Sequence, residues 1–216
     1  MKNNSLVNGF YFEGHTIAVR QPIDSDIYSG EWSSWYNSYA ITKNNSHGVY
    51  PVSVDDEAAY VKGRAGRKDC LLFAIVNKDN GVLLGNAALQ GIDYINRKAN
   101  IAITIGVAGG ISTCVEVYGL LLDHAFCRLN MNRVGDATHD RLGSLVKMLS
   151  VLGIKEEGRS REYFLRDGLY SDAIHFGVLS RDFLLLKSRR GGNILFGDLD
   201  ELNCAIVAAV KSTHSA

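Results

Sequence analysis

The sequence predicts an α+β protein in which a mixed, mostly antiparallel sheet is flanked by helices and followed by a C-terminal extension. Short runs that alternate apolar and polar side chains predict strands, and longer segments with apolar residues at helical spacing lie between them. One predicted helix separates two strands between residues 100 and 140. Such a β-α-β passage makes a right-handed crossover between parallel strands, which places helices on both faces of the sheet.

The first predicted strand is HTIAVRQ, residues 15 to 21, which stops at Pro22. Asp24 or Ser25 then caps a short helix pair with an aromatic stripe. A further helix begins at Ser53, because acidic residues follow in its first turn and complement the helix dipole. We expect it to end near residue 63 or 66.

Two apolar runs, CLLFAIVNK and VLLGNAALQGID, surround the turn Asp79-Asn80-Gly81 and predict an antiparallel hairpin. NIAITIGVAGG, residues 100 to 110, follows as another strand. The next helix is expected from about Cys114 to Leu129, because its apolar residues are spaced for one buried face.

RVGDATHD predicts a strand, and GSLVKMLSVLG predicts a helix that ends at Gly153. The final hairpin is expected in FLRDG and LYSDAIHFGVLSRDFLLL, residues 164 to 186. The tail contains a glycine turn and an amphipathic helix around residues 199 to 211. We therefore divide the chain into an N-terminal segment, a main domain and a C-terminal extension, at 1–14, 15–185 and 186–216.

Composition narrows the classes of function. Lys plus Arg and Asp plus Glu are 23 each, so the net charge is zero and a nucleic-acid partner is disfavoured. No apolar run approaches the ~20 residues of a membrane span, and the N-terminus lacks an apolar signal region. The scattered cysteines contain no CxxC pair, which favours reduced thiols, a cytoplasmic location and no metal site.

The stretch GVAGGISTC, residues 106 to 114, joins a predicted strand to a predicted helix through a glycine turn. Gly109 and Gly110 permit positive φ, and the hydroxyls of Ser112 and Thr113 follow them. Backbone N–H groups at such a helix start form an anion site. The spacing from Thr113 to Glu116 also fits a capping box, so a purely structural cap is the alternative.

Two longer stretches, LLLDHAFCRLNMNRV and residues 152 to 183, resemble the GNAT superfamily of acyl-CoA-dependent N-acetyltransferases. The resemblance covers roughly residues 15 to 185 and is strongest to the branch acting on ribosomal-protein N-termini, amino-sugars and antibiotics. It implies acetyl-CoA as the cofactor, held in a gap where strand NIAITIGV parts from RVGDATHD. The implied cofactor contacts are Ile103, Ile105, Val107, Gly109, Gly110, Ile111, Ser112, Thr113 and Cys114.

The sequence departs from the family pattern at several positions. The basic residue of the pyrophosphate loop is absent. Leu142 and Leu149 occupy the positions of a usual Asn and of the Tyr that often protonates the leaving thiolate, and neither can transfer a proton. A strand carboxylate often used as a base falls on Asn100, which can only orient an amine by hydrogen bonds.

The remaining candidates each have a structural alternative. His139 and Asp93, with Asn100, are the candidate catalytic residues, although His139 can instead cap the next helix. Trp35, Tyr36 and Tyr94 are the candidate substrate-binding residues, although aromatic residues at helical spacing are more often core.

The resemblance implies direct, acetyl-CoA-dependent acetylation of a primary amine on a small molecule such as an amino-sugar, or of a protein N-terminus. The alternative is a catalytically inactive GNAT-fold protein that has lost acetyl-CoA binding and serves in binding or assembly, with the tail as a homodimer strand or as a helix in a partner's groove. A third alternative is a different ligand in the same gap, without a pyrophosphate.

Overall fold

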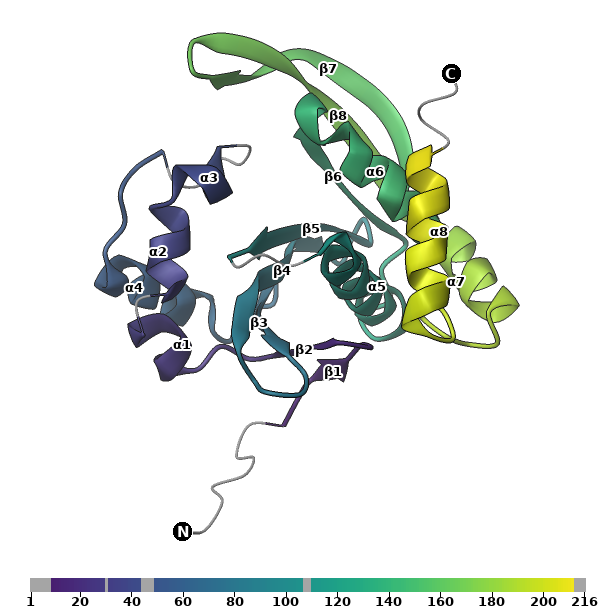
Figure 1. Ribbon diagram of the computed structural model, residues 1–216, viewed down its shortest axis with the longest axis horizontal. Coiled ribbons are helices and arrows are strands. Elements are labelled where there is room, and N and C mark those ends of the chain that lie inside the picture. Colours follow the sequence, from purple (N-terminus) through teal and green to yellow (C-terminus); the bar gives the residue numbers. More distant parts are fainter. Residues whose placement is uncertain (1–8, 30, 44–48, 107–109, 212–216) are drawn as a thin grey trace.

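Eight strands form one sheet in the computed structural model, which describes residues 9–29, 31–43, 49–106 and 110–211 (Figure 1). Their order is β1-β2-β3-β4-β5-β6-β8-β7. Neighbours are antiparallel except β5 and β6, which run parallel, as the crossover predicts. The strands are β1 Phe12–Glu13, β2 Ile17–Arg20, β3 Cys70–Asn77, β4 Leu83–Asp93, β5 Lys98–Ile105, β6 Arg133–His139, β7 Lys155–Arg166 and β8 Leu169–Leu179.

Helices cover both faces of this sheet (Figure 1). One layer contains α1 Asp24–Tyr28, α2 Glu31–Tyr36, α3 Tyr39–Thr42 and α4 Val54–Arg64. The other contains α5 Ile111–Cys127, α6 Gly143–Leu149, α7 Ser180–Arg189 and α8 Leu199–Lys211. Two 3-10 turns, Asp140–Leu142 and Ser150–Leu152, flank α6. Within the described residues, no helix is both long enough and apolar enough to cross a membrane.

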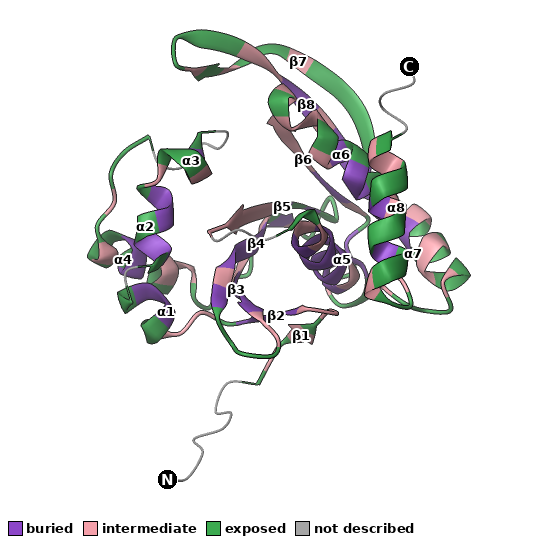
Figure 2. Ribbon diagram, in the orientation of Figure 1, coloured by how far each residue is buried: buried purple, intermediate pink, exposed green. Residues whose placement is uncertain are grey.

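The strand period divides the core into two clusters. Ile17 and Val19 of β2 pack in the larger cluster beneath α5, whereas Ala18 between them packs in the smaller cluster with Trp32 of α2. Successive side chains of a strand point to opposite faces, so one buried strand serves both layers. Helix α5 lies between the sheet and the helices α6 and α8, and most of its residues are buried (Figure 2).

Several elements agree with the sequence predictions. Ser53 caps α4 by accepting a hydrogen bond from the Asp56 N–H, and the helix ends at Arg64. The turn at residues 79–81 joins β3 to β4. Gly153 ends the segment after α6 with φ of 81°, in the left-handed region that favours glycine. Helix α8 matches the predicted range of 199 to 211.

The predicted final hairpin is wrong at both ends. β7 already begins at Lys155, and β8 ends at Leu179, so residues 180–186 form the start of α7 rather than a strand. The apolar residues of this segment are spaced for a helix, with Phe183 buried and Leu186 partly buried. Helix α7 therefore runs across the predicted boundary at residue 185. Leu202 and Ile206 of α8 belong to the main core.

A second correction concerns the start of α5. The predicted capping box from Thr113 to Glu116 does not form. The Glu116 side chain is fully buried and accepts hydrogen bonds from the N–H of His15 at 2.8 Å, the N–H of Thr16 at 3.0 Å and the Thr16 hydroxyl at 2.8 Å. A Cβ on Gly14 would lie 2.5 Å from the Glu116 Oε2, so a larger residue there would displace this carboxylate. Glu116 thus ties the β1–β2 turn to α5, and this hairpin brings residues 12 and 13 into the sheet.

Replacement of Glu116 by Ala should destabilise the fold by about 3 kcal/mol, because two part-buried backbone N–H groups and a hydroxyl lose their charged acceptor. Urea denaturation followed by circular dichroism measures this loss. The control is Glu31→Ala on α2, an exposed carboxylate whose loss should change stability by less than about 0.5 kcal/mol. Equal effects of the two substitutions would contradict the assigned role of Glu116.

Candidate active site

The central feature of the site is the point where β5 and β6 part. They pair only at Lys98 with Arg133 and at Ala99 with Val134. At the next position, the correctly oriented Asn100 amide donates to the Gly135 carbonyl at 2.8 Å. The Asn100 side chain thus replaces the next backbone hydrogen bond between β5 and β6. After this position the two strands diverge, as the resemblance implied.

Beyond this point, one edge of β5 faces the gap. The Gly106 N–H donates to the Leu84 carbonyl of β4, whereas the Arg97 carbonyl accepts from the Asn132 N–H on the opposite side. Because backbone groups alternate along a strand, residues 101, 103 and 105 direct their N–H and C=O groups toward β6. No described strand pairs with this edge after Ala99.

The gap holds a cleft of about 240 Å³. Its floor and walls come from both diverging strands, from α5 and from the start of α6. The cleft-lining residues are Ile101, Ala102, Ile103, Thr104, Tyr118, Asp136, Ala137, Thr138, His139, Leu142, Leu145, Phe164 and Phe176. Ile103 and Ile105 also pack their side chains against the main core, so the edge that they form is held in place.

Helix α5 begins beside this edge. Gly110 is its N-cap, with extended backbone and no side-chain cap. The first turn contains the predicted residues Ile111, Ser112, Thr113 and Cys114, and burial raises the pKa of the Cys114 thiol to about 11, which keeps it protonated at neutral pH. The predicted contacts Val107 and Gly109 lie outside the described residues. The start of α5 presents backbone N–H groups that no described side chain caps.

Two cleft residues were missed by the sequence predictions. Asp136 of β6 lies in the cleft with one carboxylate oxygen accepting from the Ala137 N–H at 2.8 Å, and burial raises the pKa of this carboxyl above its ordinary value. Tyr118 of α5 is buried in the same cleft, and burial strongly raises its pKa, so its hydroxyl stays protonated. The sequence contained a signal for Asp136, because alternate residues of a strand share a face and Asp136 lies two residues after the buried Val134.

Comparisons with known proteins agree with this geometry. No family model matches the chain. A Bacillus licheniformis protein named "Uncharacterized N-acetyltransferase p20" is 27% identical over 179 residues, covering 80% of this chain and 97% of that protein. The solved spermidine N-acetyltransferase of Vibrio cholerae, in complex with CoA and spermine, superposes with a TM-score of 0.69 at 21% identity over 78% of this chain and 98% of its own. A GCN5-related N-acetyltransferase from Brucella melitensis has a TM-score of 0.64 at 21% identity, covering 82% and 81%.

The chain has the fold of the solved GNAT N-acetyltransferases and is similar in sequence to a protein named as an N-acetyltransferase. The fold predicted from the sequence is thereby confirmed, because the solved GNAT structures share it over most of the chain. In this GNAT fold the position expected for a proton-donating Tyr is the fully buried Leu149, and Leu142 forms an apolar part of the cleft wall.

His139 lies in the GNAT cleft, but structural contacts occupy both of its ring nitrogens. The side chain is 1% exposed, and its Nε2 lies 2.7 Å from the Ser171 hydroxyl. Its Nδ1 accepts from the Arg141 N–H at 3.2 Å and lies 2.9 Å from the Asp140 carboxylate. The ring also stacks on Phe164. These contacts match the alternative prediction, in which His139 caps the turn after β6.

Asp93 and Tyr94 lie in the turn between β4 and β5, and neither lines the cleft. Asp93 accepts from the N–H groups of Ile95 and Asn96, and its contacts with Asn96 lower the pKa of its carboxyl. It lies opposite Lys98, the first residue of β5, where β5 still pairs with β6. This turn is therefore at the opposite end of β5 from the point where the strands are far apart. Tyr94 is 52% exposed in the same turn.

Trp35 and Tyr36 are core residues in this structure, with 5% and 7% exposure, so the structural alternative describes them better than substrate binding does. The Tyr36 hydroxyl donates to the Asn86 amide oxygen of β4 at 3.0 Å. Trp35 stacks on Trp32 and faces Gly106, where a Cβ would lie 1.9 Å from the indole ring. Trp35 and Tyr36 thus support the C-terminal end of β5 and the adjacent β4 from the sheet face opposite α5.

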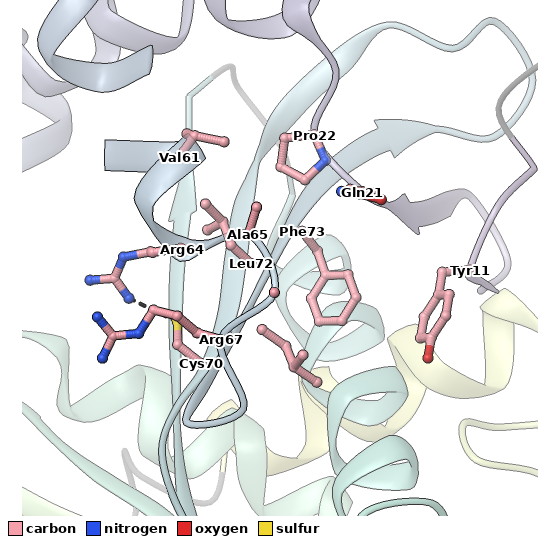
Figure 3. A pocket seen from close by; sticks show the side chains of 12 residues that line it. Tyr11, Gln21, Pro22, Val61, Arg64, Ala65, Arg67, Cys70, Leu72 and Phe73 are labelled. Atoms are coloured by element: carbon pink, nitrogen blue, oxygen red, sulfur yellow. Dashed lines mark hydrogen bonds between the residues drawn. The ribbon is translucent and has the colours of Figure 1, made fainter. Parts of the chain in front are cut away.

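A separate cavity of about 290 Å³ lies between the end of α4 and the start of β3 (Figure 3). Phe73, Tyr11 and Pro22 contribute apolar surface, and Arg64 donates to the Cys70 sulfur at 2.8 Å. It shares no lining residue with the cleft, so it is not part of the same site.

Substitution of Gly106 by Ala should destabilise the protein by about 2 kcal/mol, because the new methyl group overlaps the Trp35 ring and a well-packed core must shift. Thermal unfolding measures the loss, and intrinsic fluorescence should report a changed environment of Trp35. Gly63→Ala on α4 is the matched control, since no atom lies within 4 Å of its Cβ and helix propensity favours Ala. A stability of Gly106→Ala equal to that of the control would refute the contact.

Proposed function

We propose that this protein transfers the acetyl group of acetyl-CoA directly to a primary amine of a small molecule. The observation that carries the proposal is the edge of β5 that no described strand pairs with, where Ile101 and Ile103 direct backbone N–H and C=O groups into the cleft. An extended chain with amide groups can bind such an edge as an added strand. The pantetheine arm of acetyl-CoA has this chemistry, so the residues present fit it.

The diphosphate of the same molecule would meet the start of α5. The N–H groups at Ile111 and Ser112 and the positive end of the 17-residue helix dipole favour an anion there. No Lys or Arg occurs between residues 106 and 127, so this part of the site relies on backbone dipoles. When bound, acetyl-CoA supplies an activated thioester carbonyl.

The amine would enter through a second cavity of about 300 Å³, next to the point where β5 and β6 diverge. Its lining includes Lys98, Asn100, Arg133, Asp136, Tyr163 and His175. The Vibrio relative acetylates spermidine, which supports a small amine as the acceptor class here. An amino-sugar and a protein N-terminus remain alternatives within the same reaction. The inactive alternative rested on the missing basic residue of the loop together with Asn100, Leu142 and Leu149, and neither the relative nor the solved neighbour supports it.

Isothermal titration should give a micromolar Kd for acetyl-CoA. S-acetylpantetheine, which lacks the diphosphate and the adenosine beyond it, should bind at least about fivefold more weakly, because it loses an attraction to the α5 helix end of about 1 kcal/mol. Equal affinities would contradict the assigned anion site. The absence of any heat with acetyl-CoA at millimolar concentration would contradict the proposed function.

Incubation with acetyl-CoA and one of three amines should yield a product heavier by one acetyl group, detected by mass spectrometry. The three probes are spermidine, glucosamine and a short peptide with a free N-terminus. Each tests one acceptor class, and we expect turnover of a small amine rather than of the peptide. Acetyl-CoA binding without acetylation of any probe would contradict the transferase proposal.

A further inference from the structure

Asp136 occupies a special position on the diverging strand. It lies two residues after Val134, the last residue of β6 that pairs with β5. It lines the cleft of about 240 Å³ on the α5 side and also the cavity of about 300 Å³ that contains Asn100 and His175. Asp136 is thus reached from both cavities, at the place where a thioester on the β5 edge and an incoming amine would meet.

The Asp136 carboxylate also has hydrogen-bonding capacity left. Its single described hydrogen bond is the one that Oδ1 accepts from the Ala137 N–H, and no described Lys, Arg or His lies within ion-pair distance. One nearby carboxylate is already engaged, because Glu157 forms a bidentate pair with Arg133. The Asp136 side chain is half-buried, so it remains accessible.

We infer that Asp136 is the catalytic base that accepts the proton of the attacking amine, an assignment that rests on the proposed function. The amine lone pair forms the C–N bond, and the C–S bond breaks with its electron pair leaving on sulfur. The nitrogen proton passes to the free oxygen of Asp136, and the thiolate takes one proton from water. Asn100, fixed on Gly135, borders the same cavity.

Titratable groups surround Asp136 on several elements. Tyr118 of α5 faces it across the cleft, and Lys98 of β5, Arg133 of β6, Tyr163 of β7 and His175 of β8 line the neighbouring cavity. Leu142 and Leu145, before and within α6, add no charge. Burial is the largest influence and raises the pKa of Asp136, while the Ala137 N–H and then His175 oppose it. A base of raised pKa accepts a proton more readily at neutral pH.

The test compares Asp136→Asn with wild type, using acetyl-CoA and the probe amine that wild type acetylates fastest. We expect kcat/KM to fall by about 10²- to 10⁴-fold, as for loss of a general base. Wild-type kcat/KM should fall as the pH decreases through the Asp136 pKa, because the carboxylate becomes protonated. That acidic limb should be absent in Asp136→Asn. Asp79→Asn, at an exposed turn between β3 and β4, should keep wild-type kinetics.

Two readouts do not depend on turnover. Calorimetric affinity for acetyl-CoA should change less than about threefold in Asp136→Asn. In the unliganded protein, the carboxyl ¹³C signal lost in Asp136→Asn should titrate above the value of about 3.9 for a free aspartate. Titration at or below that value would overturn the assignment, as would wild-type rates and an unchanged pH profile in the variant. An inactive wild type would instead overturn the proposed function, and the assignment with it.

Discussion

β5 and β6 pair over only two residues each, and the positions of both cavities follow from this short contact. A parallel pair joined through a 17-residue helix must lie side by side at its start, because the crossover returns the chain to the edge of the same sheet. The Asn100 amide then bonds Gly135, and the strands diverge. The divergence leaves backbone groups of β5 without a strand partner and creates a cleft whose walls are two rigid strands.

Buried polar contacts hold the elements around this gap. Glu116, in the middle of α5, accepts from the β1–β2 turn, which attaches the first hairpin of the sheet to the helix that borders the cleft. On the other face, Trp32 donates to Glu57 of α4 at 3.1 Å, and Trp35 packs on Gly106 at the end of β5. A buried carboxylate is tolerated only when donors surround it, so these contacts restrict how the two helical layers sit on the sheet.

The cleft has mostly apolar walls and few polar groups. This suits a direct transfer reaction, in which holding the two reactants in place matters more than a large number of catalytic side chains. The family's usual carboxylate and tyrosine positions hold Asn100 and Leu149, yet the same cleft contains Asp136 and Tyr118 on different elements. Burial shifts both pKa values upward, which keeps the tyrosine protonated and makes the carboxylate a better proton acceptor near neutral pH. Proton-transfer chemistry therefore has residues available even where the sequence departs from its family.

The sequence by itself determined the elements, because local signals specify them: Ser53 starts α4, Gly153 ends the α6 segment, and the alternation in residues 70–93 gives a hairpin. The resemblance to the GNAT superfamily indicated a gap between β5 and β6, with Ile103 and Ile105 as expected cofactor contacts. Only the tertiary structure decided the roles of single side chains. Trp35 is core, both nitrogens of His139 are engaged, and Glu116 bonds residues about a hundred positions away. Burial and distant partners decide such roles, and neither is encoded in the spacing of neighbouring residues.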